Sequence, residues 1–342
     1  MSACAGRRRS DPARKATRAA VPLLAAILLG LPGAAAAGEI TVPLTEPQIP
    51  REGALAAVRQ WSWAGGALTP LALDVDPSGG VWGIEGRGHR LFLIDDREEG
   101  GIRAAGGGEG PGGLDFAARL FARSGLKIFT LDPWKATLYG YDLNGVQEER
   151  IELAASLADA GEGLGEAVDF CLSPSGDLYL LDGPRQRILR FDGAARFQEI
   201  IGEAEGIDLR GPVALDIDGY GRISVLTTRP AGLGVIEPQG VRFRWEPLLP
   251  GAQETAVQPV CLAVDAWGNA FVGDAQAGEV LVRPSGSSPW RLAPGEGGMQ
   301  PADLAWEREG RLLVADASGA KIWVFALRYG PQGAAGGVDP GE

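Results

Sequence analysis

Five charged residues stand in otherwise apolar, strand-like segments of the sequence, and their types are suited to binding chemistry. Four are carboxylates and one is an arginine: Asp74, Arg119, Asp169, Asp216 and Asp303. A carboxylate removed from water needs a cation, an arginine, a shared proton or a bound water. The set would therefore suit a polar ligand or a metal ion. Because carboxylate oxygens are hard ligands, calcium is the cation to expect if one binds.

A second set of residues falls in loops that follow predicted strands and predicts a relatively basic rim. Its members are Arg87, His89, Trp134, Arg185 and Arg187. In an acidic chain such a rim would attract an acidic peptide, a glycan acid or a partner protein. Solvated loop charge is the alternative interpretation.

The sequence offers little for catalysis. His89 is the single histidine, so a histidine metal site cannot form. No nucleophile-elbow sequence is present, and the glycine run 106–110 lacks the Lys-Ser/Thr of a phosphate loop. These observations favour a non-catalytic binding or scaffold function. The alternative is a metal-assisted hydrolase or lyase, similar to lactonases, that uses the carboxylates named above.

The elements that must position these residues are given by a repeat. A short apolar strand that usually ends in an acid recurs six times, at 81–85, 128–132, 178–182, 223–227, 270–274 and 312–316. The spacing of its copies, with Gly-containing turns and further short strands between them, is typical of four-stranded propeller blades. The sequence therefore predicts an all-β fold, a six-bladed β-propeller over residues 58–329.

The two ends of the repeat array predict how the ring closes. The sixth blade has no fourth strand after Ala326, and an alternating segment at 58–63 precedes the first blade without a blade of its own. An open ring would leave unpaired sheet edges. We therefore expect residues 58–63 to supply the outer strand of the last blade, with 38–57 as an extended segment before it.

Alignment of the innermost strands places the charged residues. One face is apolar at Leu71 and Leu73 and at the equivalent positions of the other blades. The opposite face carries three layers, of which the first holds Arg119, Asp169 and Asp303 and the second holds Asp74 and Asp216. This alternation predicts that the charged residues lie at or beside the central channel, where they are expected to add little to stability. A water-filled channel whose wall tolerates charge is the alternative to a binding site.

Two further groups of acids are expected to be structural. Asp76, Asp218 and Asp265 precede tight turns and are expected to cap them. The acids that end the second strands, Glu85, Asp132, Asp182, Asp274 and Asp316, recur once per blade and are expected to brace the loops that follow.

The repeat resembles a known family. Segments 301–325, 259–274 and 167–191 are similar to NHL-type repeats, with a proline or alanine before the inner strand and an acid at the end of the second. The resemblance covers about residues 58–329 and implies a six-bladed propeller used for binding or scaffolding, and in a few cases for catalysis. Blade four departs from the pattern, because Thr227 replaces the acid.

The chain ends predict export. Residues 1–37 combine a basic start, an apolar stretch and the small residues Ala35 to Ala37, as in a Sec-type signal peptide. Cleavage there would leave 26 basic and 43 acidic residues, a net charge of −17. Residues 330–342 are rich in Gly and Pro and are expected to form a disordered tail.

We therefore expect a periplasmic or secreted monomer with a protein, peptide or glycan partner. The acidic charge argues against nucleic acid, and no stable membrane insertion is expected after cleavage. Cys171 and Cys261 fall on inner strands separated by a whole blade and are expected to be free thiols.

Overall fold

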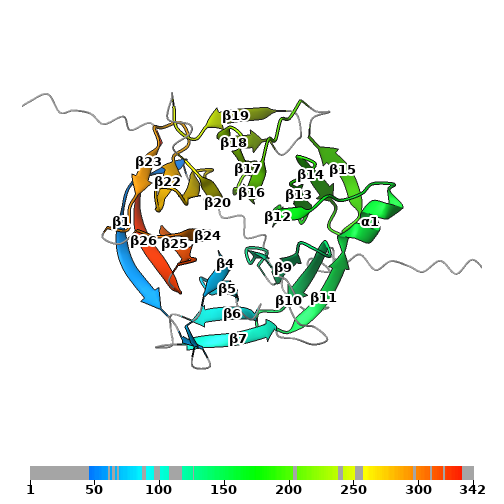
Figure 1. The fold of residues 1–342 in the computed structure, drawn as a ribbon, viewed down its shortest axis with the longest axis horizontal. Helices are drawn as coiled ribbons and strands as arrows, with labels where there is room; N and C mark the ends of the chain where they lie inside the picture. The colour runs from blue at the N-terminus through cyan, green and yellow to red at the C-terminus, as the bar shows by residue number, and fades with distance from the viewer. Residues whose placement is uncertain are drawn as a thin grey trace, which may run out of the picture.

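The fold is a ring of six small antiparallel sheets, each of four strands (Figure 1). The computed structural model describes residues 46–332 apart from 61, 64–65, 68, 87–89, 96–100, 108–117, 126, 203–205, 238–241, 251–256, 296–297, 309 and 319. The predicted signal peptide, Arg87 and His89 lie outside the described residues. The predicted six-bladed β-propeller is confirmed.

The strands of each blade run from the axis outward. The innermost strands are β4 (Pro70–Val75), β8 (Arg119–Phe121), β12 (Ala167–Leu172), β16 (Pro212–Ile217), β20 (Pro259–Val264) and β24 (Pro301–Glu307). The second strands are β5 (Val81–Glu85), β9 (Ile128–Asp132), β13 (Leu178–Asp182), β17 (Ile223–Thr228), β21 (Ala270–Asp274) and β25 (Arg311–Asp316). The third strands are β6 (Arg90–Asp95), β10 (Thr137–Tyr141), β14 (Arg187–Phe191), β18 (Ala231–Ile236), β22 (Glu279–Arg283) and β26 (Lys321–Pro331). The outer strands are β7 (Gly101–Gly107), β11 (Gln147–Glu152), β15 (Phe197–Ile201), β19 (Phe243–Pro247), β23 (Trp290–Leu292) and β1 (Gln48–Gln60).

The ring has two distinct faces. The second strands end on one face, where the chain also passes from each blade to the next, and we call it the linker face. The tight turns that join the first strand to the second, such as the turn between β12 and β13, lie on the opposite face, which we call the turn face. The first layer of charged residues therefore lies near the linker face.

The ring is closed by β1, which pairs antiparallel with β26 from Gln48–Pro331 to Gln60–Lys321 (Figure 1). The closing strand is thus N-terminal, as predicted, but it spans Gln48–Gln60 rather than 58–63. Pro50, Gly53 and two register shifts hide the alternation that a strand normally shows. An outer edge strand tolerates such residues because one of its sides needs no ladder bonds.

A β-bulge breaks the alternation of the inner strands in five blades. In β12 the register shifts between Ala167 and Asp169, so Val168 is the extra residue. The same shift leaves Leu71, Val213, Val260 and Ala302 half-buried. This layer of the predicted apolar face is therefore partly exposed, whereas the layer around Leu73 and Phe170 is buried as predicted. The bulge turns the following side chain toward the axis.

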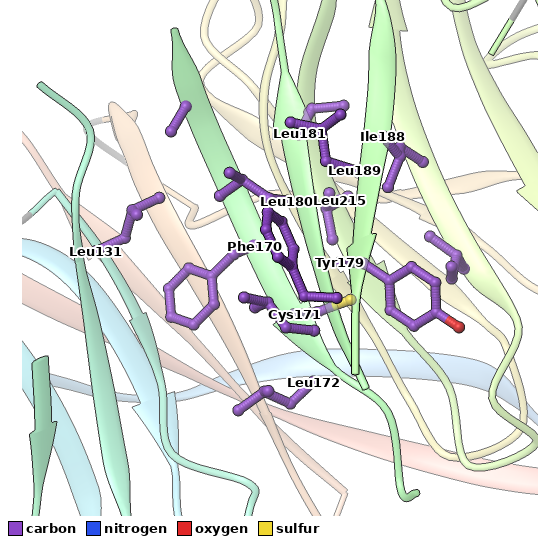
Figure 2. Close-up of a cluster of buried hydrophobic side chains, with 14 of the residues drawn as sticks. Leu131, Phe170, Cys171, Leu172, Tyr179, Leu180, Leu181, Ile188, Leu189 and Leu215 are labelled. Atoms are coloured by element: carbon purple, nitrogen blue, oxygen red, sulfur yellow. The ribbon is translucent and has the colours of Figure 1, made fainter. Parts of the chain in front are cut away.

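Apolar side chains fill the spaces between neighbouring blades. Around β12 and β13, Phe170 and Leu180 pack with Leu131 of blade two and Leu215 of blade four (Figure 2). Trp82 and Ile84 of blade one similarly meet Tyr139 of blade two. Each blade therefore depends on its two neighbours for burial of its apolar surface.

Three small elements were not predicted. A seven-residue helix, α1 (Leu153–Asp159), follows β11 and buries Leu153 and Leu157, while β2 (Ser62–Trp63) pairs with β3 (Gly66–Ala67). Across the described part of the chain, no helix has the length and apolar character needed to span a membrane.

Removal of residues 38–66 should destabilise the whole ring rather than trim a tail. β1 pairs with β26 at eleven positions, and its loss would uncover the edge of the last blade. We expect the melting temperature to fall by more than about 5 °C, since a domain of this size loses about 2–4 °C per kcal/mol. Calorimetry of the shortened and mature chains measures this. Equal melting temperatures would contradict the closure, and a chain lacking only residues 38–45 is the control.

Candidate functional site: the axis and the linker face

Four aspartates at the axis join neighbouring blades through backbone hydrogen bonds. In blade one, Asp74 Oδ1 accepts from Val75 N (2.9 Å) and its Oδ2 accepts from Ala122 N of blade two (2.7 Å). Three equivalent inter-blade bonds run from Leu215 N to Asp169 Oδ2 (2.9 Å), from Val264 N to Asp216 Oδ2 (2.7 Å) and from Leu73 N to Asp303 Oδ2 (2.8 Å).

These bonds have a simple physical cause. Each innermost strand is a sheet edge, so some of its backbone N–H groups have no strand to pair with. A carboxylate that accepts two such groups removes the penalty of burying them, and each charge-assisted bond is worth about 1.5–3 kcal/mol. The sequence analysis did not predict this inter-blade bonding, and the expectation that these carboxylates add little to stability stays a prediction.

Arg123 connects the carboxylates across the axis. Its Nη2 contacts Asp216 of blade four, and its Nε lies 3.4 Å from Asp74 Oδ1 of blade one. The guanidinium also lies over the Phe121 ring, 5.0 Å from the ring centroid. One arginine from blade two therefore holds blades one, two and four together.

The sequence analysis assigned no role to Arg123. A signal was present, because Arg123 stands at the position that an acid occupies in blades one, four, five and six. Burial raises the pKa of Asp74, and Arg123 opposes that rise. Burial also lowers the pKa of Arg123, but the two carboxylates outweigh this effect and raise it on balance.

A second charged group lies at the linker-face end of the axis. Arg119 Nε is 3.6 Å from Asp169 Oδ1, and both side chains are partly exposed. Burial raises the pKa of Asp169 to about 6 and that of Asp303 to about 7, although Arg119 opposes both shifts. The structure thus brings all five sequence-predicted axial residues to one cavity, as two separate clusters.

The cavity at the axis is small. Its volume is about 40 Å³, enough for a few water molecules. Within the described ranges, no three His, Cys, Asp or Glu side chains are placed to share a metal ion. Arg119 and Arg123 supply positive charge beside the axial carboxylates, where a bound calcium ion was expected to supply it.

Cys171 and Cys261 are buried free thiols, as predicted. Burial raises the pKa of both thiols above the ordinary value. A buried thiol that keeps its proton is a poor nucleophile.

The repeated acids act as predicted. Asp316 accepts from Ser318 N and from Trp323 Nε1, both at 2.8 Å, and so fixes the loop after β25. Asp265 likewise accepts from Trp267 N and Asn269 N (2.9 Å each) in its turn. In blade four Thr227 takes the place of the acid, and its hydroxyl accepts from Trp245 Nε1 at 3.1 Å.

Three members of the predicted rim are among the described residues. Trp134 is 79% exposed on the linker face of blade two. Arg187 pairs with Asp182 (3.1 Å) and Glu162 (3.3 Å), while Arg185 donates to Gly163 O at 2.6 Å. Acids therefore compensate Arg187, whereas the indole of Trp134 is open to a partner.

Comparison with known proteins supports the fold alone. No family model and no curated protein matches the chain, so the resemblance to NHL-type repeats rests on its residues. Virginiamycin B lyase from Staphylococcus aureus superposes with a TM-score of 0.55 at 12% identity, covering 82% of this chain and 89% of that one. YCF48 bound to D1 peptide gives 0.51 at 11% identity, covering 78% and 81%. The Cps50 (Swd1) propeller domain of Myceliophteria thermophila gives 0.51 at 12%, covering 78% and 85%.

The Arg123→Met variant should lose about 3 kcal/mol of unfolding free energy, because it leaves two buried carboxylates without their cation. Urea denaturation measures the loss. The control is Arg196→Met, which removes a 75% exposed arginine paired with Asp192 and should cost less than about 1 kcal/mol. Equal losses in both variants would contradict the role of Arg123.

The Asp303→Asn variant should change how stability depends on pH. Between about pH 4 and 7 the unfolded chain ionises at this position while the folded chain keeps its proton, because the folded pKa is about 7. The folded state then binds more protons, so the free energy of unfolding falls as pH rises through this window. Asparagine cannot titrate. The free energy of unfolding of the variant should therefore rise relative to that of the wild type between pH 4 and pH 8.

Thermal melts of wild type and variant at several pH values test this. Asp159→Asn, at an exposed position on α1, is the control and should keep a constant offset. A constant offset for Asp303→Asn as well would show that Asp303 keeps an ordinary pKa.

Proposed function

We propose that this protein is a non-catalytic binding or scaffold propeller that acts outside the cytoplasm and presents its linker face to a protein partner. The proposal joins the signal-like residues 1–37 with the chemistry of the described site. The axial carboxylates, which would be the acids and bases of a hydrolase or lyase, already hold backbone N–H groups and arginines. The cavity beside them has room for a few water molecules.

The exposed indole of Trp134 carries the proposal. It is the most exposed large hydrophobic side chain among the described residues, at 79%, in the loop between β9 and β10. An indole in water is costly, and tryptophan is enriched among the residues that dominate protein interfaces. Asp132 accepts from Trp134 N at 3.0 Å and holds this loop in place. The side chain is therefore presented on a fixed backbone, which lowers the entropy lost on binding.

The Trp134→Ala variant should lose the partner while keeping its fold. We expect at least a tenfold loss of affinity, since removal of a central interface tryptophan costs about 2 kcal/mol or more. The measurement is affinity capture by the tagged mature chain from the cell-envelope fraction of the organism that encodes it, followed by titration of the purified partner.

The matched control is Val146→Ala, which removes a 60% exposed apolar side chain from the turn face of the same blade. Partner binding by wild type and Val146→Ala, with loss in Trp134→Ala, supports the proposal. Equal binding by all three would show that Trp134 is not in the interface, and no specific partner for wild type would contradict a binding function.

A further inference from the structure

A groove lies between blades three and four on the linker face. Pro184 and Gln186 come from the loop between β13 and β14. Arg210 comes from the linker into β16, Pro212 is the first residue of β16, and Arg229 follows β17. Its volume is about 640 Å³, within the range of about 300–1,000 Å³ that is typical of ligand sites. The groove is therefore far larger than the cavity at the axis.

The backbone of the groove is held in place. Thr228 donates from both its N and its Oγ1 to Gly211 O, each at 2.9 Å. Gly211 has φ +60°, and a Cβ there would lie 2.5 Å from Thr228 Oγ1, so a larger residue would break this contact. Arg229 N also donates to Arg210 O at 3.3 Å. The two segments that carry the arginines are thus tied together before any ligand binds.

Arg229 has no counterpart in the neighbouring blade, because Arg187 begins β14 and faces Asp182 across the ladder, whereas Gly232 takes that place opposite Thr227 in blade four. In blade three, Arg187 pairs with Asp182, the acid that ends the second strand. In blade four Thr227 replaces that acid, and its hydroxyl donates to Pro230 O at 3.0 Å. The guanidinium of Arg229 is exposed and makes no hydrogen bond or ion pair with the residues that the structure describes.

The second arginine of the groove is also accessible. Arg210 is 65% exposed and donates from Nε (3.0 Å) and Nη2 (2.7 Å) to the carboxylate of Asp208, which is 54% exposed. A carboxylate ligand of Arg210 would share or replace this paired contact with Asp208. Two guanidinium groups therefore line one groove of an acidic chain, where they can hold a carboxylate with paired hydrogen bonds.

We propose that this groove binds a carboxylate-bearing, extended segment of a protein partner. The proposal rests on the proposed function, because it places one contact of that partner on the linker face. Pro184, Pro212 and Val213 supply apolar walls for a peptide side chain or backbone. The described lining residues include no aromatic ring on which a sugar would stack, which favours a peptide over an acidic glycan.

The probe for this proposal is a blocked peptide of Glu-Pro repeats, which keeps an extended polyproline II backbone. A Gln-Pro peptide of equal length removes only the charge, and oligogalacturonate is the glycan arm. Fluorescence anisotropy with the mature chain should show binding of the Glu-Pro peptide and much weaker binding of the Gln-Pro peptide. Binding should weaken as ionic strength rises from about 0.01 to 0.15 M, because the Debye length falls from about 30 to 8 Å.

Two exposed arginines of blade four provide the matched variants. Arg229→Ala should weaken binding of the Glu-Pro peptide by about tenfold or more, the expected loss of a charge-assisted hydrogen bond. Arg244→Ala removes an equal charge from β19, where Arg244 is 67% exposed, and should leave binding unchanged. Equal effects of both variants, absence of Glu-Pro binding, or tighter binding of oligogalacturonate would each overturn the proposal.

The peptide-binding and partner-binding experiments distinguish a wrong groove assignment from a wrong proposed function. If the Glu-Pro peptide does not bind but Trp134→Ala still loses the partner, only the groove assignment is wrong. If the peptide binds through Arg229 but no partner depends on Trp134, the groove remains a carboxylate site and the Trp134 interface is wrong.

Discussion

Six sheet edges meet at the axis of this ring, and their unpaired backbone N–H groups are the constraint on which the rest of the structure depends. An inner strand pairs with its second strand on one side only, so its other side must find acceptors in a narrowing space. Asp74, Asp169, Asp216 and Asp303 supply them, and each joins its blade to the next. Arg123 then allows Asp74 and Asp216 to remain close together.

These hydrogen bonds and ion pairs leave the axial residues little capacity for binding or catalysis. Asp74 and Asp216 each hold two backbone N–H groups and Arg123, so they have few lone pairs left for a substrate. The remaining cavity is only about 40 Å³. A catalytic or binding site would then lie in the loops, where blades of similar backbone carry different side chains. Trp134 and Arg229 occupy such loops in blades two and four.

The sequence predicted the repeat well because each second strand combines apolar residues with a terminal acid that holds its loop. Asp132, Asp274 and Asp316 accept N–H groups of the loops that follow them, as expected, whereas Asp182 accepts from Gly165 N in the linker before β12. The closing strand was harder to locate, because Pro50 and Gly53 interrupt its pattern where an edge strand needs no strict alternation. Arg123 was missed for another reason. Its partners come from blades one and four, and only the closed ring brings them together.

The groove shows how a departure from a repeat can create a binding surface without a new structural element. In blade three the strand-end acid Asp182 accepts from Gly165 N in the linker before β12 and pairs with Arg187 at the start of β14. In blade four a threonine braces the loop with a hydroxyl, which carries no charge, and Arg229 keeps its positive charge for solvent or a partner. The linker between the two blades adds Arg210 to the lining of the groove. The proposed groove would therefore be a local positive site on a strongly acidic molecule, and the long-range field of the chain would reject anions that do not reach the groove itself.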